Sequence, residues 1–192
     1  MNHHSYATLV AGALLFTPAA AADAARGQEM AAACAGCHGD NGNSKTENVP
    51  SLAGHPAPYL VVQLILFREQ QRHNDVMTPL AKALSDQDIE NLAAYFSKHQ
   101  RVPADAPLVS PKADRGKTIA DAGRCGACHL PDYSGREQIP RLAAQREDYL
   151  VKTMRDYKAG KRSGLDGMMT SVLYNYADDD LAALAAYLAR LP

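Results

Sequence analysis

The stretch CAGCH at Cys34–His38 is followed, later in the same 192-residue chain, by CGACH at Cys125–His129. Together the two stretches contain all four cysteines of the protein. On one turn of helix, residues i, i+3 and i+4 share a face, so each stretch points two thiols and one imidazole in the same direction. The sequence therefore presents the same set of three ligand side chains twice.

A repeat extends well beyond these clusters. Matched residues lie 90 to 92 positions apart, as in the pairs Cys34/Cys125, Pro50/Pro140, Tyr59/Tyr149, Met77/Met169 and Tyr95/Tyr187. Between the copies, RVPADAPLVSP at 101–111 contains three prolines, which cannot continue a helix and favour an extended linker. The repeat predicts one domain at 23–100 and a second at 112–192, joined by a Pro-rich linker at 101–111.

Helical spacing of apolar residues is clearest near the end of each copy. These residues are Ile89, Leu92, Ala93 and Phe96 in the first copy, and Leu181, Leu184, Ala185 and Leu188 in the second. Ser85 and Asp88 form a capping-box pattern before the first of these helices. Ala177 stands in the position of that serine, so the cap of the second helix could shift to Asp178.

Two more helices are expected in each copy. The Ala-rich segment before each cysteine pair predicts an opening helix, and residues 56–70 and 146–160 predict a middle helix. No stretch shows sustained strand alternation, and a hydrophobic share of 46% is enough for a globular core. We therefore expect an all-α protein made of two tandem small domains.

The Cys-x-x-Cys-His spacing indicates covalent haem attachment. Two thiols at this spacing can form thioether bonds with the two vinyl groups of one haem, and the adjacent imidazole then lies against the iron as an axial ligand. We therefore predict two covalently attached haem c groups. They are attached through Cys34, Cys37, Cys125 and Cys128, and ligated by His38 and His129.

Three other chemistries use cysteine pairs. A disulfide framework suits an exported protein but needs no histidine after each pair. Paired zinc ligands usually lie about 15–20 residues apart, whereas these pairs begin at Cys34 and Cys125, in separate repeats. A thioredoxin-like redox pair belongs to a βαβ unit, and the sequence predicts no strands. Covalent haem accounts best for both the histidines and the repeat.

A methionine thioether suits the sixth position on the iron and raises its potential. Met77 is the only methionine that follows the haem motif in the first copy, in a predicted loop before the last helix, and Met169 matches it in the second. Met168 is adjacent and could replace Met169. Met30 and Met154 are expected to fill the cores.

Other histidines are weaker candidates for the iron. His55 has Gln145 at the matched position of the second copy. His73 and His99 have no matched histidine there. A repeated site is therefore better explained by the methionines.

Residues 1–22 have the pattern of a secretory signal peptide. The apolar run YATLVAGALLF is followed by small residues, so cleavage is expected after Ala22. The alternative is an uncleaved anchor, although the run is short for a span of roughly 20 residues. No later segment is long and apolar enough to cross a bilayer, which leaves membrane contact through partner complexes. The formal net charge of -1 offers no basic surface for nucleic acid.

Taken together, these motifs resemble the cytochrome c4-type dihaem cytochromes c. The resemblance rests on CAGCHGDNGN, PSLAGHPAPYL and MTPLAKALSDQDIENLAAYF in the first copy, and on CGACH, IPRLAAQREDYL, YKAGKR and LAALAAYL in the second. It implies two class I cytochrome c domains related by a pseudo-two-fold axis, each with a His/Met-ligated haem. It also implies a carrier in the periplasm that passes electrons towards a terminal oxidase.

The same resemblance implies two packing roles. The carbonyls of Pro50 and Pro140 should accept the Nδ1 protons of the two haem histidines, which fixes the rings. Gly27 and Gly116 should allow the first and last helices to cross closely, beside Tyr95 and Tyr187. The sequence departs from the family at His55, where a glutamine is usual, and in the second methionine segment, which reads TSVLYNY in place of TPLAKAL.

Two six-coordinate haems leave no open iron, so we expect outer-sphere electron transfer and no enzymatic activity. The expected partners are redox proteins: a respiratory-complex donor and a terminal oxidase acceptor. One alternative is an electron-transfer subunit of a dehydrogenase or oxidase complex. A second is a dihaem enzyme, such as a peroxidase or thiosulfate dehydrogenase, but that chemistry needs an open or differently ligated iron.

Charge differs between the two copies. Residues 23–100 contain six basic and nine acidic side chains, a formal −3, while residues 101–192 contain fourteen and twelve, a formal +2. Basic residues gather in the second copy at Lys152, Lys158, Lys161 and Arg162. Asymmetry of this kind steers encounter with charged partners, so we expect donor and acceptor to dock at different ends.

Overall fold

A computed structural model describes residues 21–103, 110–162 and 167–192. The predicted signal peptide, apart from its last two residues, and the linker residues 104–109 lie outside this range. Among the described residues, no helix is both long and apolar enough to cross a bilayer.

The part of the chain that the structure describes is helical and contains no strand. The first half contains α1 (Ala24–His38), α2 (Ala57–Arg68), α3 (Met77–Lys82) and α4 (Asp86–Ser97). The second contains α5 (Pro111–Ala122), α6 (Gly126–His129), α7 (Glu147–Lys158), α8 (Met168–Leu173) and α9 (Asp178–Leu188). The expected opening, middle and last helices are all present. The expected methionine loops instead contain the short helices α3 and α8, whose six residues are too few for a periodic signal.

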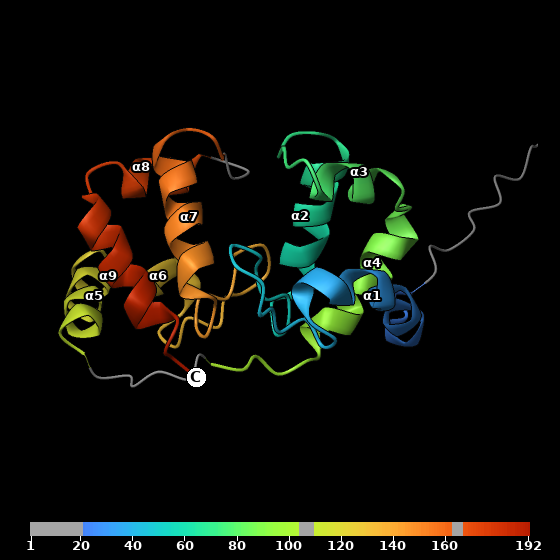
Figure 1. Cartoon of the computed structure of the whole chain (residues 1–192), viewed down its shortest axis with the longest axis horizontal. Helices are drawn as coiled ribbons and strands as arrows, with labels where there is room; N and C mark the ends of the chain where they lie inside the picture. The colour runs from blue at the N-terminus through green and yellow to red at the C-terminus, as the bar shows by residue number, and fades with distance from the viewer. Residues whose placement is uncertain (1–20, 104–109, 163–166) are drawn as a thin grey trace, which may run out of the picture.

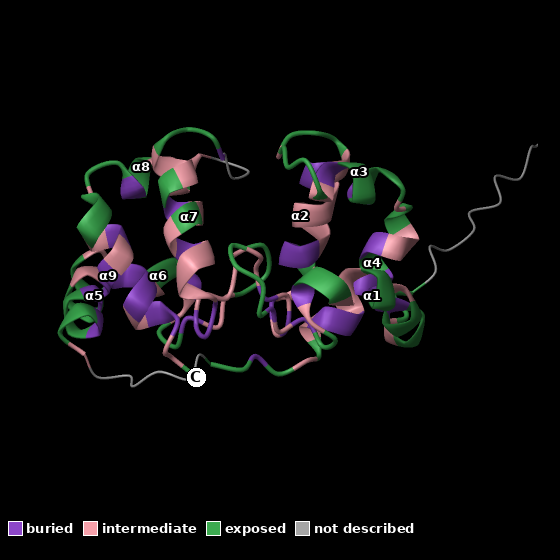
Figure 2. Cartoon of the chain, viewed as in Figure 1, coloured by how far each residue is buried: buried purple, intermediate pink, exposed green. Residues whose placement is uncertain are grey.

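The two halves lie side by side, with α2 and α7 innermost and with α3 and α8 at the same edge of the molecule (Figure 1). Buried residues gather inside each half separately (Figure 2). Leu60, Leu92 and Phe96 belong to the first core, and Met154 and Leu184 to the second. The chain thus folds as two tandem domains, each with its own hydrophobic core, and Met154 is a core residue as predicted.

Glycine brings the first and last helices of each half into close contact. A Cβ atom at Gly27 would lie 2.1 Å from the carbonyl oxygen of Asn91, and one at Gly116 would lie 2.0 Å from that of Ala183. Both glycines also face the Cβ of a tyrosine, Tyr95 or Tyr187, at 2.9 and 2.8 Å respectively. The crossing that the family resemblance implied is therefore confirmed in both halves.

The last helices begin at matched positions. The Ser85 hydroxyl accepts the N–H of Asp88, and the Asp88 carboxylate accepts the N–H of Ser85, each at 3.1 Å, which is the predicted capping box. In α9, Ala177 remains the N-cap residue, so the shift to Asp178 as cap is wrong. The Asp180 carboxylate accepts the Ala177 N–H at 3.0 Å, which retains half of the box without a cap hydroxyl.

The opening helix of the second half is interrupted, contrary to the prediction of one continuous segment. Nine positions separate Gly116 from Cys125, against seven between Gly27 and Cys34. Two extra helical residues would turn the cysteines by roughly 200° relative to the crossing. The chain instead leaves the helix after Ala122 and takes a left-handed conformation at Arg124, with φ of 52°. The break absorbs the insertion and lets α6 carry the second haem motif.

Candidate haem-binding sites

The two haem-motif histidines are held in the same way. His38 ends α1, and its Nδ1 lies 2.8 Å from the carbonyl oxygen of Pro50. His129 ends α6, and its Nδ1 lies 2.9 Å from the carbonyl oxygen of Pro140. A carbonyl can only accept, so Nδ1 carries the proton and the Nε2 lone pair remains available to a metal. These contacts confirm what the resemblance implied for both prolines.

Burial also favours the metal-binding form of these rings. Desolvation lowers the pKa of His38 and of His129, and the bond to the proline carbonyl offsets this only in part. Both imidazoles are therefore neutral at neutral pH, and neutral imidazole is the form that coordinates iron.

The four cysteines form two matching pairs, and no disulfide joins them. Cys34 and Cys125 are partly buried against the cores of their halves, while Cys37 and Cys128 are exposed. Burial raises the pKa of the Cys34 and Cys125 thiols. No group of three or more His, Cys, Asp or Glu side chains in the described ranges could hold a metal ion. The paired thiols beside each oriented imidazole fit two thioether bonds and one axial ligand of a covalently attached haem in each half.

The methionines lie on the short helices that precede the last helix of each half. Met77 is the first residue of α3 and is partly buried, and its N–H donates to the Asn74 side chain at 2.8 Å. Met169 is partly buried and packs against the second core, whereas Met168 is 53% exposed. α8 begins at Met168. The two candidate iron ligands, Met168 and Met169, are therefore the first two residues of this helix.

Three further histidines among the described residues have contacts of their own. His73 is exposed and lies 3.1 Å from the carboxylate of Asp75. The His99 ring packs edge-on against Tyr95, with ring centroids 4.4 Å apart. His55 is buried where the two halves meet. None of these placements repeats in the other half, in agreement with their low ranking as iron ligands.

The halves meet through residues at matched positions of the repeat. Gln145, 2% exposed, accepts the N–H of Ser51 at 2.8 Å and donates to the Ser51 carbonyl at 2.9 Å. Its Nε2 also lies 3.4 Å from Nε2 of His55, the residue that matches it in the first half. Contact between matched residues is what a pseudo-two-fold axis produces.

Two matched arginines extend this interface. Arg162 donates to the Tyr59 hydroxyl at 3.4 Å and to Gln63 at 3.1 Å, and Arg72 donates to the Tyr149 hydroxyl at 3.2 Å. Each guanidinium also lies over an aromatic ring of its own half, at 4.3 Å for Arg72 and 4.8 Å for Arg162. Arg162 is only 7% exposed, so the expectation that it belongs to the solvated docking charges of the second half is wrong.

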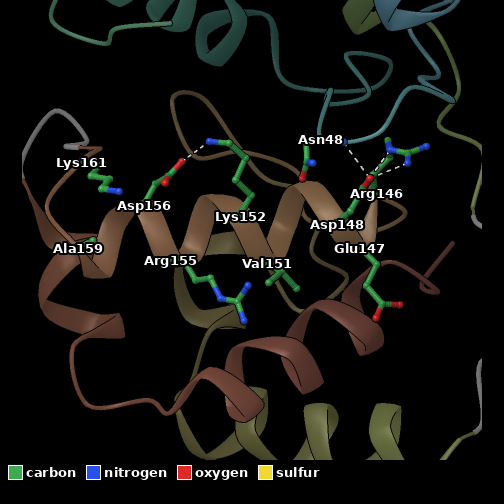
Figure 3. Close-up of a pocket in the computed structure, with 10 residues that line it drawn as sticks. All are labelled: Asn48, Arg146, Glu147, Asp148, Val151, Lys152, Arg155, Asp156, Ala159 and Lys161. Atoms are coloured by element: carbon green, nitrogen blue, oxygen red, sulfur yellow. Dashed lines mark hydrogen bonds and ion pairs between the residues drawn. The ribbon is translucent and has the colours of Figure 1, made fainter.

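Residues of the two halves also meet beside α7 (Figure 3). The N–H of Asn48, from the first half, donates to the Asp148 carboxylate at 2.9 Å, and Arg146 pairs with the same carboxylate at 2.7 Å. Burial by itself would raise the pKa of Asp148, but Arg146 and the N–H donors outweigh it and lower that pKa. No local sequence pattern marks the residues of this interface. The one hint in the sequence is that the pairs Arg72/Arg162 and Tyr59/Tyr149 occur at the same spacing in the repeat.

Two domains that each carry Cys-x-x-Cys-His at the end of a helix, a carbonyl-oriented imidazole and a methionine on a short helix define a tandem c-type cytochrome. The cytochrome c family profile matches residues 24–100 and again 113–192. Cytochrome c4 of Pseudomonas aeruginosa is 37% identical over 90% of each chain. Cytochrome c4 of Azotobacter vinelandii is 34% identical, again over 90% of each. The crystal structure of cytochrome c4 from Pseudomonas stutzeri superposes with a TM-score of 0.83 at 32% identity, covering 90% of this chain and all of that one.

Relatives with other names also occur. The thiosulfate dehydrogenase electron acceptor of Thiomonas intermedia is 35% identical over 94% of this chain and 88% of its own. The structure of thiosulfate dehydrogenase TsdBA from Marichromatium purpuratum matches with a TM-score of 0.74 at 32% identity, over 88% of this chain and 40% of that one. The chain belongs to the cytochrome c4 family. It is a dihaem electron-transfer cytochrome with two covalently bound haem c groups.

Proposed function

We propose that this cytochrome is a periplasmic carrier that takes electrons from a respiratory-complex donor and delivers them to a terminal oxidase. The observation that carries the proposal is the pair of buried histidines whose Nδ1 atoms are fixed by proline carbonyls. Such a ring keeps one orientation through every redox cycle, which suits outer-sphere transfer.

The proposed axial ligands are His38 with Met77 in the first half, and His129 with Met169 in the second. The partial burial of Met169 against the core, beside an exposed Met168, supports this register. With both axial positions filled, neither iron can bind a substrate, so the protein carries electrons and catalyses no reaction of its own.

We also propose that the mature chain begins at Asp23, with domains at 23–100 and 112–192 joined by residues 101–111, whose first residue packs on the first domain and whose last begins α5. Asp23 is the N-cap of α1, and its carboxylate accepts the N–H of Ala25 at 2.8 Å. Its own N–H lies 2.7 Å from Asn91 of α4. Cleavage after Ala22 would leave both interactions intact.

A second candidate partner is a thiosulfate dehydrogenase. Relatives that share the full two-domain length are named as its electron acceptors, and one solved thiosulfate dehydrogenase contains a matching region. In that case the donor is a sulfur-oxidising enzyme rather than a respiratory complex, while the haem chemistry of this chain stays the same.

Rapid mixing distinguishes these partners. The oxidised dihaem protein is mixed with a reduced quinol-oxidising complex or with thiosulfate-reduced dehydrogenase, and the reduced protein with a terminal oxidase. The proposal predicts fast, salt-dependent transfer from the quinol-oxidising complex and to the oxidase. Fast transfer from the dehydrogenase alone would assign the protein to thiosulfate oxidation.

A further inference from the structure

Arg101 is a buried cation without a counter-ion among the residues that the structure describes. It follows α4 and is 5% exposed. Its Nε donates to the carbonyl oxygen of Ala53 at 2.7 Å, but Nη1 and Nη2 have no hydrogen-bond partner among the described residues. It forms no ion pair with any side chain that the structure describes. Because a guanidinium stays charged in proteins, an arrangement of this kind requires an anion.

The surroundings add positive charge. Burial, and then the nearby Arg141, lowers the pKa of Arg101 to about 9, which still leaves it charged at neutral pH. Burial and then Arg101, Arg141 and Arg162 lower the pKa of the neighbouring His55, and a hydrogen bond with the Ser51 backbone offsets this only in part. A carboxylate in this region would neutralise part of this charge.

His55 supplies a further buried donor. The side-chain oxygen of Gln145 accepts N–H groups from Ser51 at 2.8 Å and from Arg146 at 3.0 Å, so its amide nitrogen faces His55. Nε2 of His55 must then act as the acceptor in the 3.4 Å contact, which puts the ring proton on Nδ1. That buried Nδ1 makes no well-aligned hydrogen bond with the described residues, and the Ser51 backbone only partly compensates the ring.

One short segment connects these donors to the first haem site. The carbonyl of Pro50 orients His38, and three residues later the carbonyl of Ala53 holds Arg101. His55 lies two residues beyond Ala53 in the same segment. A haem attached at Cys34 and Cys37 would bring two propionate carboxylates into the same half, where no described acidic side chain pairs with Arg101.

We propose that Arg101 and His55 together bind a carboxylate, and that this carboxylate is a propionate of the haem attached to the first half. The two Nη atoms of a guanidinium match the two oxygens of a carboxylate. The propionate in turn neutralises a positive charge beside the contact between His55 and Gln145. This assignment depends on the covalent haem and not on which partners exchange electrons with it.

Reduction potentials test the proposal. Arg101→Gln removes a positive charge that stabilises the reduced haem and the ionised propionate. We expect one of the two midpoint potentials to fall at neutral pH and to become dependent on pH, while the other stays in place. Combining this change with Met77→His identifies the responding haem as the first. Two unchanged potentials, or a response of the second haem, would overturn the assignment.

Matched variants separate charge from structure. His55→Gln keeps an N–H donor and should preserve the potentials, whereas His55→Leu should shift the same haem as Arg101→Gln. Arg26→Gln, which removes an exposed arginine of the same half, and Asp105→Asn, which removes the nearest acid along the chain, should leave both potentials unchanged. A response to Asp105→Asn equal to that of Arg101→Gln would show that a side chain supplies the anion. If Arg101→Gln does not mature, Arg101→Lys and His55→Leu carry the same test.

The direction of the change in unfolding temperature provides an independent test. Losing one member of a buried ion pair destabilises a protein, while removing an uncompensated buried charge stabilises it. We therefore expect the haem-loaded Arg101→Met variant to unfold at a lower temperature than the parent, and a higher temperature would contradict the proposal. The potential of the responding haem should also be the same in chloride and in fluoride at fixed pH and ionic strength. A difference would show that a free anion occupies the site.

Discussion

Replacing Gln145 with methionine should weaken the association of the two halves by about 2–4 kcal/mol. The side chain makes three hydrogen bonds with the backbone, two of them to Ser51 in the other half and one to Arg146. Each is worth about 0.5–1.5 kcal/mol, and more where the partner is left buried and unpaired. Methionine keeps the apolar volume, so the loss reports hydrogen bonding rather than a cavity.

Thermal unfolding of the haem-loaded protein measures this loss. For a chain of this length, about 1 kcal/mol corresponds to about 2–4 °C, so the first transition should fall by roughly 4–16 °C and separate from the second as the halves unfold independently. Gln138→Met, at an exposed position of the same half, is the matched control. A Gln145→Met protein that unfolds in one transition within about 1 °C of the parent would refute the view that this glutamine couples the halves.

Three further predictions concern the ligands, the interface and the docking charges. Met77→Ala and Met169→Ala should each open one haem to carbon monoxide and remove one sulfur–iron charge-transfer band. If Met169→Ala leaves its haem closed, the adjacent methionine is the ligand. The pKa of Asp148 is held below its ordinary value of 3.8, so its stabilisation is present above that pH and is lost as pH falls through the lowered pKa. Asp148→Asn should therefore cost about 1 kcal/mol at pH 7 in chemical unfolding, with the difference vanishing at acid pH. Neutralising Lys158 and Lys161 should slow exchange with one partner by roughly 2- to 5-fold at low salt, and equal slowing with both partners would exclude docking at different ends.

The sequence predicts the fold well because its strongest signals are local. Each haem motif occupies a single helical turn, and the helix of Ile89 and Leu92 has both apolar periodicity and a capping box. The repeat then gives every first-half feature a partner at nearly constant spacing. The proline carbonyls and crossing glycines came from family resemblance, and the contacts of Pro50 and Gly27 bear it out.

The features that were missed depend on long-range contacts. The break near Arg124 follows from a two-residue insertion that matters only because Gly116 must cross α9 at a fixed point. Asp180 keeps its own half of the capping box, so α9 begins at the matched position although the cap hydroxyl is missing. Arg162 looks like one of several surface charges, and only the packing of the two halves buries it. No local pattern distinguishes Arg101 from a linker residue.

A redox titration followed by optical and near-infrared spectra, with and without carbon monoxide, tests the central account most directly. Two His/Met-ligated haems predict uptake of two electrons per chain, low-spin spectra in both redox states, a sulfur–iron charge-transfer band from each oxidised haem, and no change on adding carbon monoxide. A high-spin haem, or carbon monoxide binding to the unmodified protein, would show an open iron. Either result would contradict the proposal that the protein only carries electrons.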